Sequence, residues 1–221
     1  MAEQLGRYVG FEGIDGSGKS KQIELTKEFA NEVGVNTLFI HEPGATELGV
    51  DIRNSLLHNR NLKLSAMAEF ALFTADRIHT TDTLIMPALD KDMLVVTDRR
   101  IESAVYQEAG GGLTLQQMMA LSAQLLPERY MSPDALLVFS VSPEERLRRL
   151  QGRFAKVAAD KMEDREIQFY TDVQAGYARL ESLPYAHMID GERRPEEIFE
   201  EIKPLVFGKY LPPDTYKTTI V

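Results

Sequence analysis

Residues 10–22 read GFEGIDGSGKSKQ, and this stretch decides the fold. It joins an apolar run that predicts a β-strand, Tyr8–Glu12, to an amphipathic run that predicts a helix, Lys19–Val33. Between them, Gly13–Ser20 matches the pattern G-x-x-x-x-G-K-[ST] at every fixed position. In such a phosphate-binding loop (P-loop), backbone N–H groups surround a phosphate at the N-terminus of the following helix. The stretch therefore predicts a site for the phosphates of a nucleotide.

The P-loop pattern also assigns roles to two side chains. Lys19 is expected to reach the β- and γ-phosphates of the donor, and the Ser20 hydroxyl is expected to bind Mg²⁺. Kinases, GTPase switches, motor ATPases and ligases share the pattern, so it does not identify the reaction. The sequence lacks the Asn-Lys-x-Asp motif with which a GTPase reads guanine. The alternative is a glycine-rich turn beside an unrelated surface lysine.

Length and composition argue against several other classes. The chain has 221 residues, no cysteine and a formal net charge of −9. It therefore has no disulfide or thiolate metal site, and the acidic balance disfavours a general nucleic-acid binder, which needs a basic face. The first residues, MAEQLGR, lack the apolar segment of a signal peptide, and no apolar run is long enough to span a bilayer. These features fit a cytoplasmic protein.

Short apolar runs alternate with amphipathic segments along the whole chain. Strands are expected at Tyr8–Glu12, Thr37–His41, Met93–Asp98, Ala135–Val141 and His187–Asp190. Helices are expected near Lys19–Val33, Glu47–Asn59, Ser65–Asp90, Thr114–Leu125, Pro143–Arg153, Glu163–Leu183 and Pro195–Phe207. Two of the helix starts, Thr114–Gln117 and Ser142–Glu145, read as capping boxes. Apolar strands separated by helices predict one α/β domain over residues 1–207, with a parallel sheet covered on both faces. Residues 208–221 form a polar tail of unknown role.

Asp98 and Arg99 follow the apolar run Met93–Val96, so they lie at the carboxyl end of a predicted strand. Ligands of open parallel sheets bind at that edge. An acid there suits Mg²⁺ or its water shell, and an arginine grips a phosphate through its two-pronged guanidinium. The alternative is a plain surface ion pair at a strand end.

Phe73 and Arg77 are four residues apart and share one face of a predicted helix. The apolar stripe of that helix, which includes Phe70 and Thr74, points roughly 100° to the side of Phe73. A phenylalanine beside an arginine in this position can stack on a planar base while the arginine meets a base carbonyl. Packing of Phe73 against a neighbouring helix is the alternative.

Several motifs in order make the chain resemble the thymidylate kinase family of nucleoside monophosphate kinases. After the P-loop come His41–Thr46 (HEPGAT), Leu72–Arg77 (LFTADR), Asp98–Arg100 (DRR), Ser103–Gln107 (SAVYQ) and Pro133–Asp134 (PD). The resemblance implies a mobile lid at about residues 150–163, a homodimer and five parallel strands in the order 2-3-1-4-5. It also implies the Mg²⁺-dependent reaction ATP + dTMP → ADP + dTDP, with ATP bound by Gly13, Ile14, Asp15, Gly16, Ser17, Gly18, Lys19 and Ser20.

The same resemblance implies roles for the acceptor side. Arg53 and Arg99 are expected on the acceptor phosphate, and Phe73 and Arg77 on thymine. Tyr106 is expected to crowd the ribose 2′ position, and Gln107 to approach the base. Asp15 is expected to contact the ribose hydroxyl and the metal. The expected Mg²⁺ ligands are Ser20 and Asp98. The alternatives are a solvated helix arginine for Arg53 and helix packing for Tyr106 and Gln107. The residues expected in catalysis are Asp15, Lys19, Arg99 and Arg153.

The lid segment departs from the family pattern. Residues 148–156 are basic. Within them, Arg153 and Lys156 are the better candidates for the side chains that stabilise the migrating phosphoryl group with positive charge. Asp160–Glu163 (DKME) stands where the family has Asp-Arg-x-Glu, and lysine does not replace a planar arginine. A second register, Asp164–Glu166 (DRE), lies one turn later. Gly16 stands where some relatives place an arginine, so by resemblance the transition-state charge comes from the lid.

Two more departures bear on the acceptor. His41 stands where the family has arginine, and Ala45 where it has glycine. They leave room for a kinase of another deoxynucleoside monophosphate. A non-catalytic nucleotide-binding protein that kept only the P-loop is the alternative from another class, although the joint presence of Lys19, Asp98 and Arg99 weighs against it.

Overall fold

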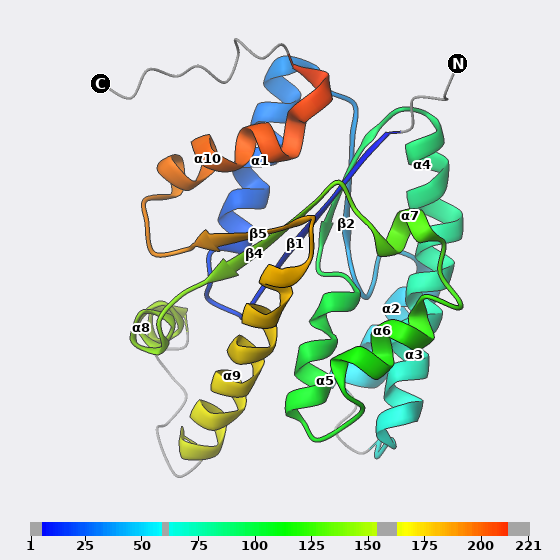
Figure 1. Cartoon of the computed structure of the whole chain (residues 1–221), viewed down its shortest axis with the longest axis vertical. Helices are drawn as coiled ribbons and strands as arrows, with labels where there is room; N and C mark the ends of the chain where they lie inside the picture. The colour runs from blue at the N-terminus through cyan, green and yellow to red at the C-terminus, as the bar shows by residue number, and fades with distance from the viewer. Residues whose placement is uncertain (1–5, 59–61, 154–162, 212–221) are drawn as a thin grey trace.

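The computed structural model describes residues 6–58, 62–153 and 163–211, excluding the side chains of residues 58, 151–153 and 163–167. Its centre is a five-stranded sheet in which every neighbouring pair is parallel, in the order β2-β3-β1-β4-β5 (Figure 1). The strands are β1 (Arg7–Gly13), β2 (Thr37–His41), β3 (Leu94–Asp98), β4 (Ala135–Ser140) and β5 (Ala186–Asp190). The order 2-3-1-4-5 and the α/β class are confirmed.

Helices cover both faces of this sheet (Figure 1). On one face, α1 (Lys19–Val33) and α10 (Pro195–Phe207) pack on the odd-numbered side chains of β1, such as Val9 and Phe11. The core on the other face includes Tyr8 and residues of α3 (Ala66–Thr80), α4 (Met86–Asp90), α5 (Val105–Ala109), α6 (Leu115–Ser122), α7 (Glu128–Met131) and α9 (Glu163–Ala178). Of the two other helices, α2 (Glu47–Arg53) packs on α3, and α8 (Pro143–Arg153) follows β4.

The apolar stripe of α10 shows how the sequence selects this packing. Ile198, Ile202 and Val206 recur every four residues and are buried against the sheet. Full burial of side chains of this size stabilises the fold by about 1.5–3 kcal/mol each. Among the described residues, no helix combines the length and the apolar character needed to cross a bilayer.

The strand register brings chemistry to one edge of the sheet. His41 at the end of β2 pairs with Asp98 at the end of β3, and Asp98 pairs with Phe11 of β1. The P-loop begins two residues beyond Phe11. The carboxyl ends of three neighbouring strands therefore meet at the point where the ligand was expected.

The predicted bounds of β2, α1, α8 and α10 are confirmed, but two long helices differ from the prediction. The expected helix 65–90 is a continuous helical path with a π turn at Thr81–Ile85 between α3 and α4. Pro87 lies in the first turn of α4 and lacks an N–H, so the hydrogen-bond ladder shifts just before it. The expected helix 47–59 is α2 followed by a π turn at Asn54–His58.

Short elements escaped the sequence patterns. The 3₁₀ turn Ile101–Ala104 and helices α5 and α7 were not predicted, because four or five residues are too few to show a helical period. Helix α6 ends earlier than expected, and α9 gives way to a 3₁₀ turn at Arg179–Ser182. The start of the tail forms a 3₁₀ turn at Gly208–Tyr210, and residues 212–221 lie outside the described part.

Of the two predicted capping boxes, one forms completely. Thr114 and Gln117 exchange both hydrogen bonds at the start of α6. At α8, Ser142 Oγ accepts from the Glu145 amide at 3.3 Å, but the Ser142 amide donates to Glu192 Oε1 at 2.6 Å. The carboxylate of Glu145 is held instead by Arg148 and Arg149. The second box is therefore only half formed, because stronger charged partners compete for its acid.

Candidate active site

The P-loop connects β1 to α1 as predicted. Gly13, Gly16 and Gly18 all have positive φ, at 136°, 90° and 100°, and Gly18 is the N-cap of α1. Position 13 also has no room for a side chain, because an added Cβ would collide with the carbonyl oxygen of Phe139 on β4. The loop therefore turns its backbone toward the N-terminus of a 15-residue helix, which is a geometry that binds anions.

Lys19 is folded into this cradle. Its Nζ donates to the carbonyl oxygens of Gly13 at 2.7 Å and Ile14 at 3.0 Å, and the residue is only 6% exposed. Burial lowers the pKa of Lys19 to about 8, and the positive charge of Arg99 contributes. The buried Ser17 hydroxyl has no hydrogen-bond partner among the described residues, whereas Ser20 is exposed. A buried cation and an unpartnered hydroxyl beside a helix N-terminus suit a polyphosphate.

Asp98 fits the expected Mg²⁺ site. Its Oδ1 is buried and has no hydrogen-bond partner in residues 6–58, 62–153 and 163–211, and its Oδ2 lies 3.4 Å from His41 Nδ1. Burial opposes ionisation, but the hydrogen bond from His41 and the charge of Lys19 outweigh it and lower the pKa of Asp98. The described residues contain no cluster of three acidic or histidine ligands. One free carboxylate oxygen near a phosphate site suits Mg²⁺, which keeps waters and takes other ligands from substrate phosphates.

Arg99 joins the donor loop to the acceptor side. Its Nη2 lies 2.6 Å from Asp15 Oδ1, and its Nη1 donates to Ser103 Oγ at 3.2 Å. The guanidinium also lies over the Tyr106 ring, 5.1 Å from the centroid. Arg99 has a φ of 74°, in the left-handed region that non-glycine residues rarely adopt. The backbone thus accepts strain at the residue predicted to hold the acceptor phosphate.

Arg53 reaches the same end of the sheet from α2. Its Nη1 donates to the Pro43 carbonyl at 2.9 Å and lies 2.6 Å from His41 Nε2. His41, which replaces the family's arginine, is exposed at the strand end and stands between Asp98 and Arg53. The departure therefore places a side chain that links the expected metal ligand to the expected phosphate ligand.

Phe73 and Arg77 lie together on α3 as predicted. The Arg77 guanidinium lies 5.6 Å from the centre of the half-buried Phe73 ring. Arg77 itself is 4% exposed, with Nη2 donating to the Arg100 carbonyl at 3.2 Å and Nε 3.8 Å from Glu42 Oε2. Within the described part of the chain, the buried Nη1 and Nε of Arg77 have no hydrogen-bond partner. Arg77 is thus anchored in the core through Nη2 and keeps unpaired donors for a ligand group.

Tyr106 and Gln107 lie on α5. The Tyr106 ring packs against Phe169 and Tyr177, with centroids 6.2 Å away in each case, and its buried hydroxyl has no geometric hydrogen-bond partner among the residues that the structure describes. Burial raises the pKa of Tyr106 to about 12. Gln107 follows it and is half-buried. The aromatic packing expected as the alternative is present, together with a hydroxyl that is available to a ligand.

The lid predictions fall largely outside the description. Arg153 ends α8, but its side chain lies outside the described part, as do the side chains of Glu163–Glu166. Lys156 and Asp160–Met162 belong to residues 154–162, which are not described. The catalytic role of Arg153 and the lid itself stay predictions.

Arg149 of α8 contacts the P-loop, and Arg146 of the same helix lies beside it, although the sequence assigned neither of them to the site. Arg149 donates to the Gly16 carbonyl at 3.1 Å and to the Gly191 carbonyl at 2.8 Å. Arg146 is 9% exposed, and its guanidinium lies 3.4 Å from the Tyr170 ring centroid. In the sequence they form the basic end of a helix, which is also explained by a favourable interaction with the helix dipole. Only the fold distinguishes this interaction from a role at the P-loop.

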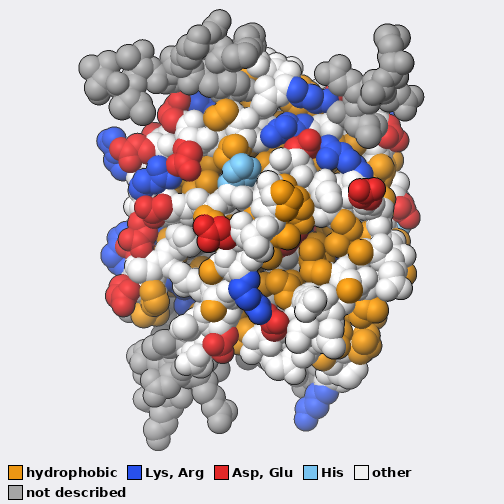
Figure 2. Space-filling view, viewed as in Figure 1, with side chains coloured by type: hydrophobic (Ala, Val, Ile, Leu, Met, Phe, Trp, Pro, Cys, Tyr) orange, Lys and Arg blue, Asp and Glu red, His pale blue; other side chains and the backbone are white. Residues whose placement is uncertain are grey.

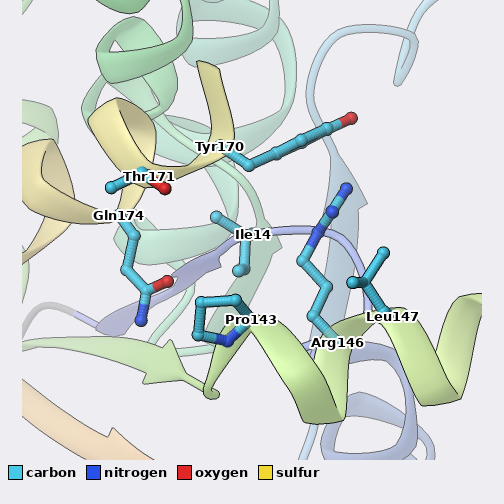
Figure 3. A pocket seen from close by; sticks show the side chains of 7 residues that line it. All are labelled: Ile14, Pro143, Arg146, Leu147, Tyr170, Thr171 and Gln174. Carbon is cyan, nitrogen blue, oxygen red and sulfur yellow. The ribbon is translucent and has the colours of Figure 1, made fainter. Parts of the chain in front are cut away.

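A small cavity lies beside the P-loop, between α8 and α9 (Figure 3). Its volume is about 20 Å³, which admits a water molecule but no nucleotide. The lining residues are Ile14, Pro143, Arg146, Leu147, Tyr170, Thr171 and Gln174. The cavity is therefore a packing gap next to the site, and the site itself is the open end of the sheet.

Comparisons with known proteins agree with this geometry. Residues 11–202 match the family model described as thymidylate kinase. The thymidylate kinase of Carboxydothermus hydrogenoformans is 33% identical over 204 residues, covering 92% of this chain and 98% of the relative. That of Kosmotoga olearia is 35% identical over 198 residues, covering 88% and 92%.

A solved structure gives the same result. The crystal structure of thymidylate kinase from Ehrlichia chaffeensis has a TM-score of 0.69 and 25% sequence identity to this chain, and the match covers 90% of this chain and 96% of that one. The P-loop, the Asp98–Arg99 turn and the α3 pair all lie within the matched residues 11–202. This chain therefore belongs to the thymidylate kinase family, whose reaction is the phosphorylation of dTMP to dTDP.

Proposed function

We propose that this chain transfers the γ-phosphoryl group of ATP to dTMP, with Mg²⁺, at the open end of the sheet. Asp98 and the Ser20 hydroxyl hold Mg²⁺, which neutralises charge on the phosphates. The ATP phosphates lie in the loop Gly13–Ser20. The dTMP ligands are Asp15, Arg53, Phe73, Arg77, Arg99, Tyr106 and Gln107.

The contact between Asp15 and Arg99 is the observation that carries this proposal. Asp15 belongs to the donor loop and Arg99 to the turn after β3, yet their side chains meet at 2.6 Å. The two halves of the site are therefore close enough for one phosphoryl group to pass between them. Alignment and positive charge from Lys19, Arg99 and the lid residue Arg153 accelerate the transfer, and no protein nucleophile is needed.

The test is a coupled assay of ADP release with Mg·ATP and, separately, dTMP, dUMP, dCMP, dGMP, AMP and GMP. We expect a preference for dTMP that Lys19→Ala abolishes. Lys21→Ala is the matched control, because Lys21 lies on the same helix but is exposed and paired with Glu24 at 2.9 Å. Preference for another monophosphate overturns the thymine-reading roles of Phe73 and Arg77. No acceptor-dependent release at all leaves a nucleotide-binding protein.

We also propose that the protein is a cytoplasmic homodimer. Large apolar side chains are exposed on α2, α3 and the segment between them, each 42–50% exposed: Leu48, Val50, Leu57, Leu62 and Met67. Figure 2 shows hydrophobic side chains gathered on the right of the viewed surface, over the region where Figure 1 draws α3, α5 and α6. Exposed apolar groups of this kind support an interface. Sedimentation equilibrium of the wild type and of Leu48→Lys tests it, and a monomeric wild type contradicts it.

A further inference from the structure

Glu12 is an acidic residue that the proposed mechanism does not use. It lies on β1, one residue before the P-loop, and its side chain is fully buried. A buried carboxylate is costly unless hydrogen bonds surround it. Glu12 meets this condition with partners from two other parts of the chain, the turn after β3 and the end of α9.

The first set of partners lies in the turn that carries Arg99. Glu12 Oε1 accepts from the Arg100 amide at 2.6 Å and from the Ser103 amide at 3.1 Å. The Ser103 hydroxyl also donates to Glu12, with distances of 2.8 Å to Oε2 and 3.0 Å to Oε1. The carboxylate therefore holds the amide directly after Arg99 and the start of the next 3₁₀ turn.

The Ser103 hydroxyl continues the chain of hydrogen bonds to the guanidinium. It accepts a hydrogen bond from Arg99 Nη1 at 3.2 Å and donates one to Glu12. Asp15 holds the other end of the guanidinium, and the Arg99 amide donates to the Phe11 carbonyl. Two further supports of Arg99, the amide of Arg100 that follows it and the Ser103 hydroxyl at Nη1, both depend on the Glu12 carboxylate. Because Arg99 adopts a left-handed φ of 74°, its direction needs such external support.

The neighbouring Arg100 shows why the turn is held so firmly. Its side chain is 0% exposed and lies between the rings of Tyr8 and Tyr130, at 4.7 and 5.1 Å from their centroids. Two adjacent arginines therefore diverge, one into the core and one toward the ligand. The amide between them is the group that Glu12 binds at 2.6 Å.

Tyr177 provides an internal comparison. Its hydroxyl donates to Glu12 Oε2 at 2.7 Å from the end of α9. It touches the same carboxylate but makes no hydrogen bond to the Arg99 turn other than the long 3.4 Å approach to Ser103 Oγ. Loss of the Tyr177 hydroxyl removes its bond to Glu12 and the long contact with Ser103 Oγ, but it leaves the bonds from the Arg100 amide and Ser103 to Glu12 and from Arg99 to Ser103 in place.

We propose that Glu12 is a positioning residue for the acceptor phosphate: its carboxylate, acting through Ser103 and the Arg100 amide, aims the Arg99 guanidinium into the site. This inference rests on the proposed role of Arg99. It predicts that Glu12 affects acceptor binding and transfer without affecting the binding of ATP, although Glu12 is next to the P-loop in sequence.

The experiment compares Glu12→Gln, Ser103→Ala and the control Tyr177→Phe with the wild type. The amide of Glu12→Gln keeps the shape but reverses one hydrogen bond and removes the charge. For Glu12→Gln and Ser103→Ala we expect the KM for dTMP to rise about tenfold, the loss expected for a charge-assisted hydrogen bond, and kcat to fall. The affinity for ATP, measured by calorimetry, is expected to stay within twofold. Tyr177→Phe is expected to keep the wild-type KM.

A purely structural role gives a different pattern. If Glu12→Gln and Ser103→Ala lower Tm but keep the wild-type KM and kcat at a temperature well below Tm, the inference is overturned. It is also overturned if Tyr177→Phe raises the KM for dTMP as much as Ser103→Ala does, because the effect then does not pass through the Arg99 turn.

Arg99→Lys separates this inference from the proposed function. If Arg99→Lys raises the KM for dTMP while Glu12→Gln does not, only the role of Glu12 fails. If Arg99→Lys itself keeps the wild-type KM, the assignment of Arg99 fails and the inference fails with it. In the double variant we expect a KM no higher than that of Arg99→Lys alone, because the two residues act as one unit. Additive effects contradict the relay.

Discussion

The donor half and the acceptor half of the site are built in different ways. The donor half is a run of eight neighbouring residues, Gly13–Ser20, that folds on itself between β1 and α1. The acceptor half collects Arg53 from α2, Phe73 and Arg77 from α3, and Arg99 from the turn after β3. The donor half therefore depends on local backbone conformation, whereas the acceptor half depends on tertiary packing.

This difference separates function from stability in a way that can be measured. In the described part of the chain, the Lys19 ammonium hydrogen-bonds only to carbonyls of its own loop, so its loss removes a phosphate ligand and little else. Arg77 binds a carbonyl next to β3 and lies near a buried acid of another segment, so its loss also opens the core. Donor variants should lose activity and keep the fold, and acceptor variants should lose some of each.

The largest effect is expected at Lys19. Lys19→Ala removes the charge that faces the donor phosphates in the transition state, and we expect kcat/KM to fall about 10³-fold, as for other groups that stabilise developing charge. The free energy of unfolding should change by less than about 1 kcal/mol, because burial already disfavours this charge. ADP release and urea denaturation measure the two quantities. Near-wild-type turnover in Lys19→Ala contradicts the donor assignment.

The donor half could be predicted from the sequence for the same local reason. All fixed positions of the P-loop are contiguous, so the spacing of Gly13, Gly18 and Lys19 determines their geometry without knowledge of the rest of the fold. The strand order needed more: Val- and Leu-rich runs indicate a parallel sheet, but the order 2-3-1-4-5 came from the family resemblance. The contacts of Arg149 with Gly16 and Gly191 were not predictable, because they join segments far apart in sequence.

The second effect is at Arg77. Arg77→Met keeps the length of the side chain but leaves Glu42 buried without its nearest guanidinium. At pH 8, where Glu42 is mostly ionised, breaking this buried charge pair costs about 3 kcal/mol of unfolding free energy, and we expect the KM for dTMP to rise as well. Phe73→Leu is the matched control, because it removes the ring beside the guanidinium and keeps the charge. If Arg77→Met is as stable as the wild type, the claim that the acceptor half depends on tertiary packing is wrong.

The acceptor half was only partly predictable from sequence. The i, i+4 spacing placed Phe73 and Arg77 on one helix face, and the structure confirms that they lie together. The depth of Arg77 in the core was not visible, because its partners Glu42 and the Arg100 carbonyl come from other segments. A helical period reports which residues share a face, but it does not report which charges meet across the fold.

The third effect is a pH dependence of stability. Burial raises the pKa of Glu42 from its ordinary 4.5 to about 7, although Arg77 and Tyr130 oppose the shift. Between these pH values the folded chain holds a proton that the unfolded chain releases, so the free energy of unfolding falls as pH rises from about 4.5 to about 7. We expect this group to contribute about 3 kcal/mol to the change.

Glu42→Gln isolates that contribution. The variant has no carboxyl group to titrate, so the difference in unfolding free energy between wild type and variant should shift in favour of the variant as pH rises from 5 to 7.5. Urea denaturation at several pH values measures it. A constant difference across the range means that Glu42 stays charged throughout, with Arg77 as a sufficient partner.

The smallest effect concerns the charge of Lys19 and sharpens the contrast between the halves. With a pKa of about 8, the empty loop loses this charge as pH rises through 8, while bound phosphates restore the charge. The apparent affinity for ATP should therefore fall about tenfold between pH 7 and pH 9. ATP binding near pH 8 should take up about half a proton, because half of the free Lys19 groups are neutral there. Calorimetry in two buffers with different heats of ionisation measures this uptake.

Lys19→Met is the control for proton uptake, since methionine keeps the aliphatic stem and has no titrating group. Its ATP binding, although weak, should show neither the uptake nor the pH dependence. Binding of dTMP to the wild type should vary little over the same range, because its proposed phosphate and base ligands include no lysine. If the affinities for ATP and dTMP fall together with rising pH, Lys19 is not the group that titrates. A parallel fall of both affinities indicates instead that the donor half and the acceptor half respond to pH as one unit, through the contact between Asp15 and Arg99.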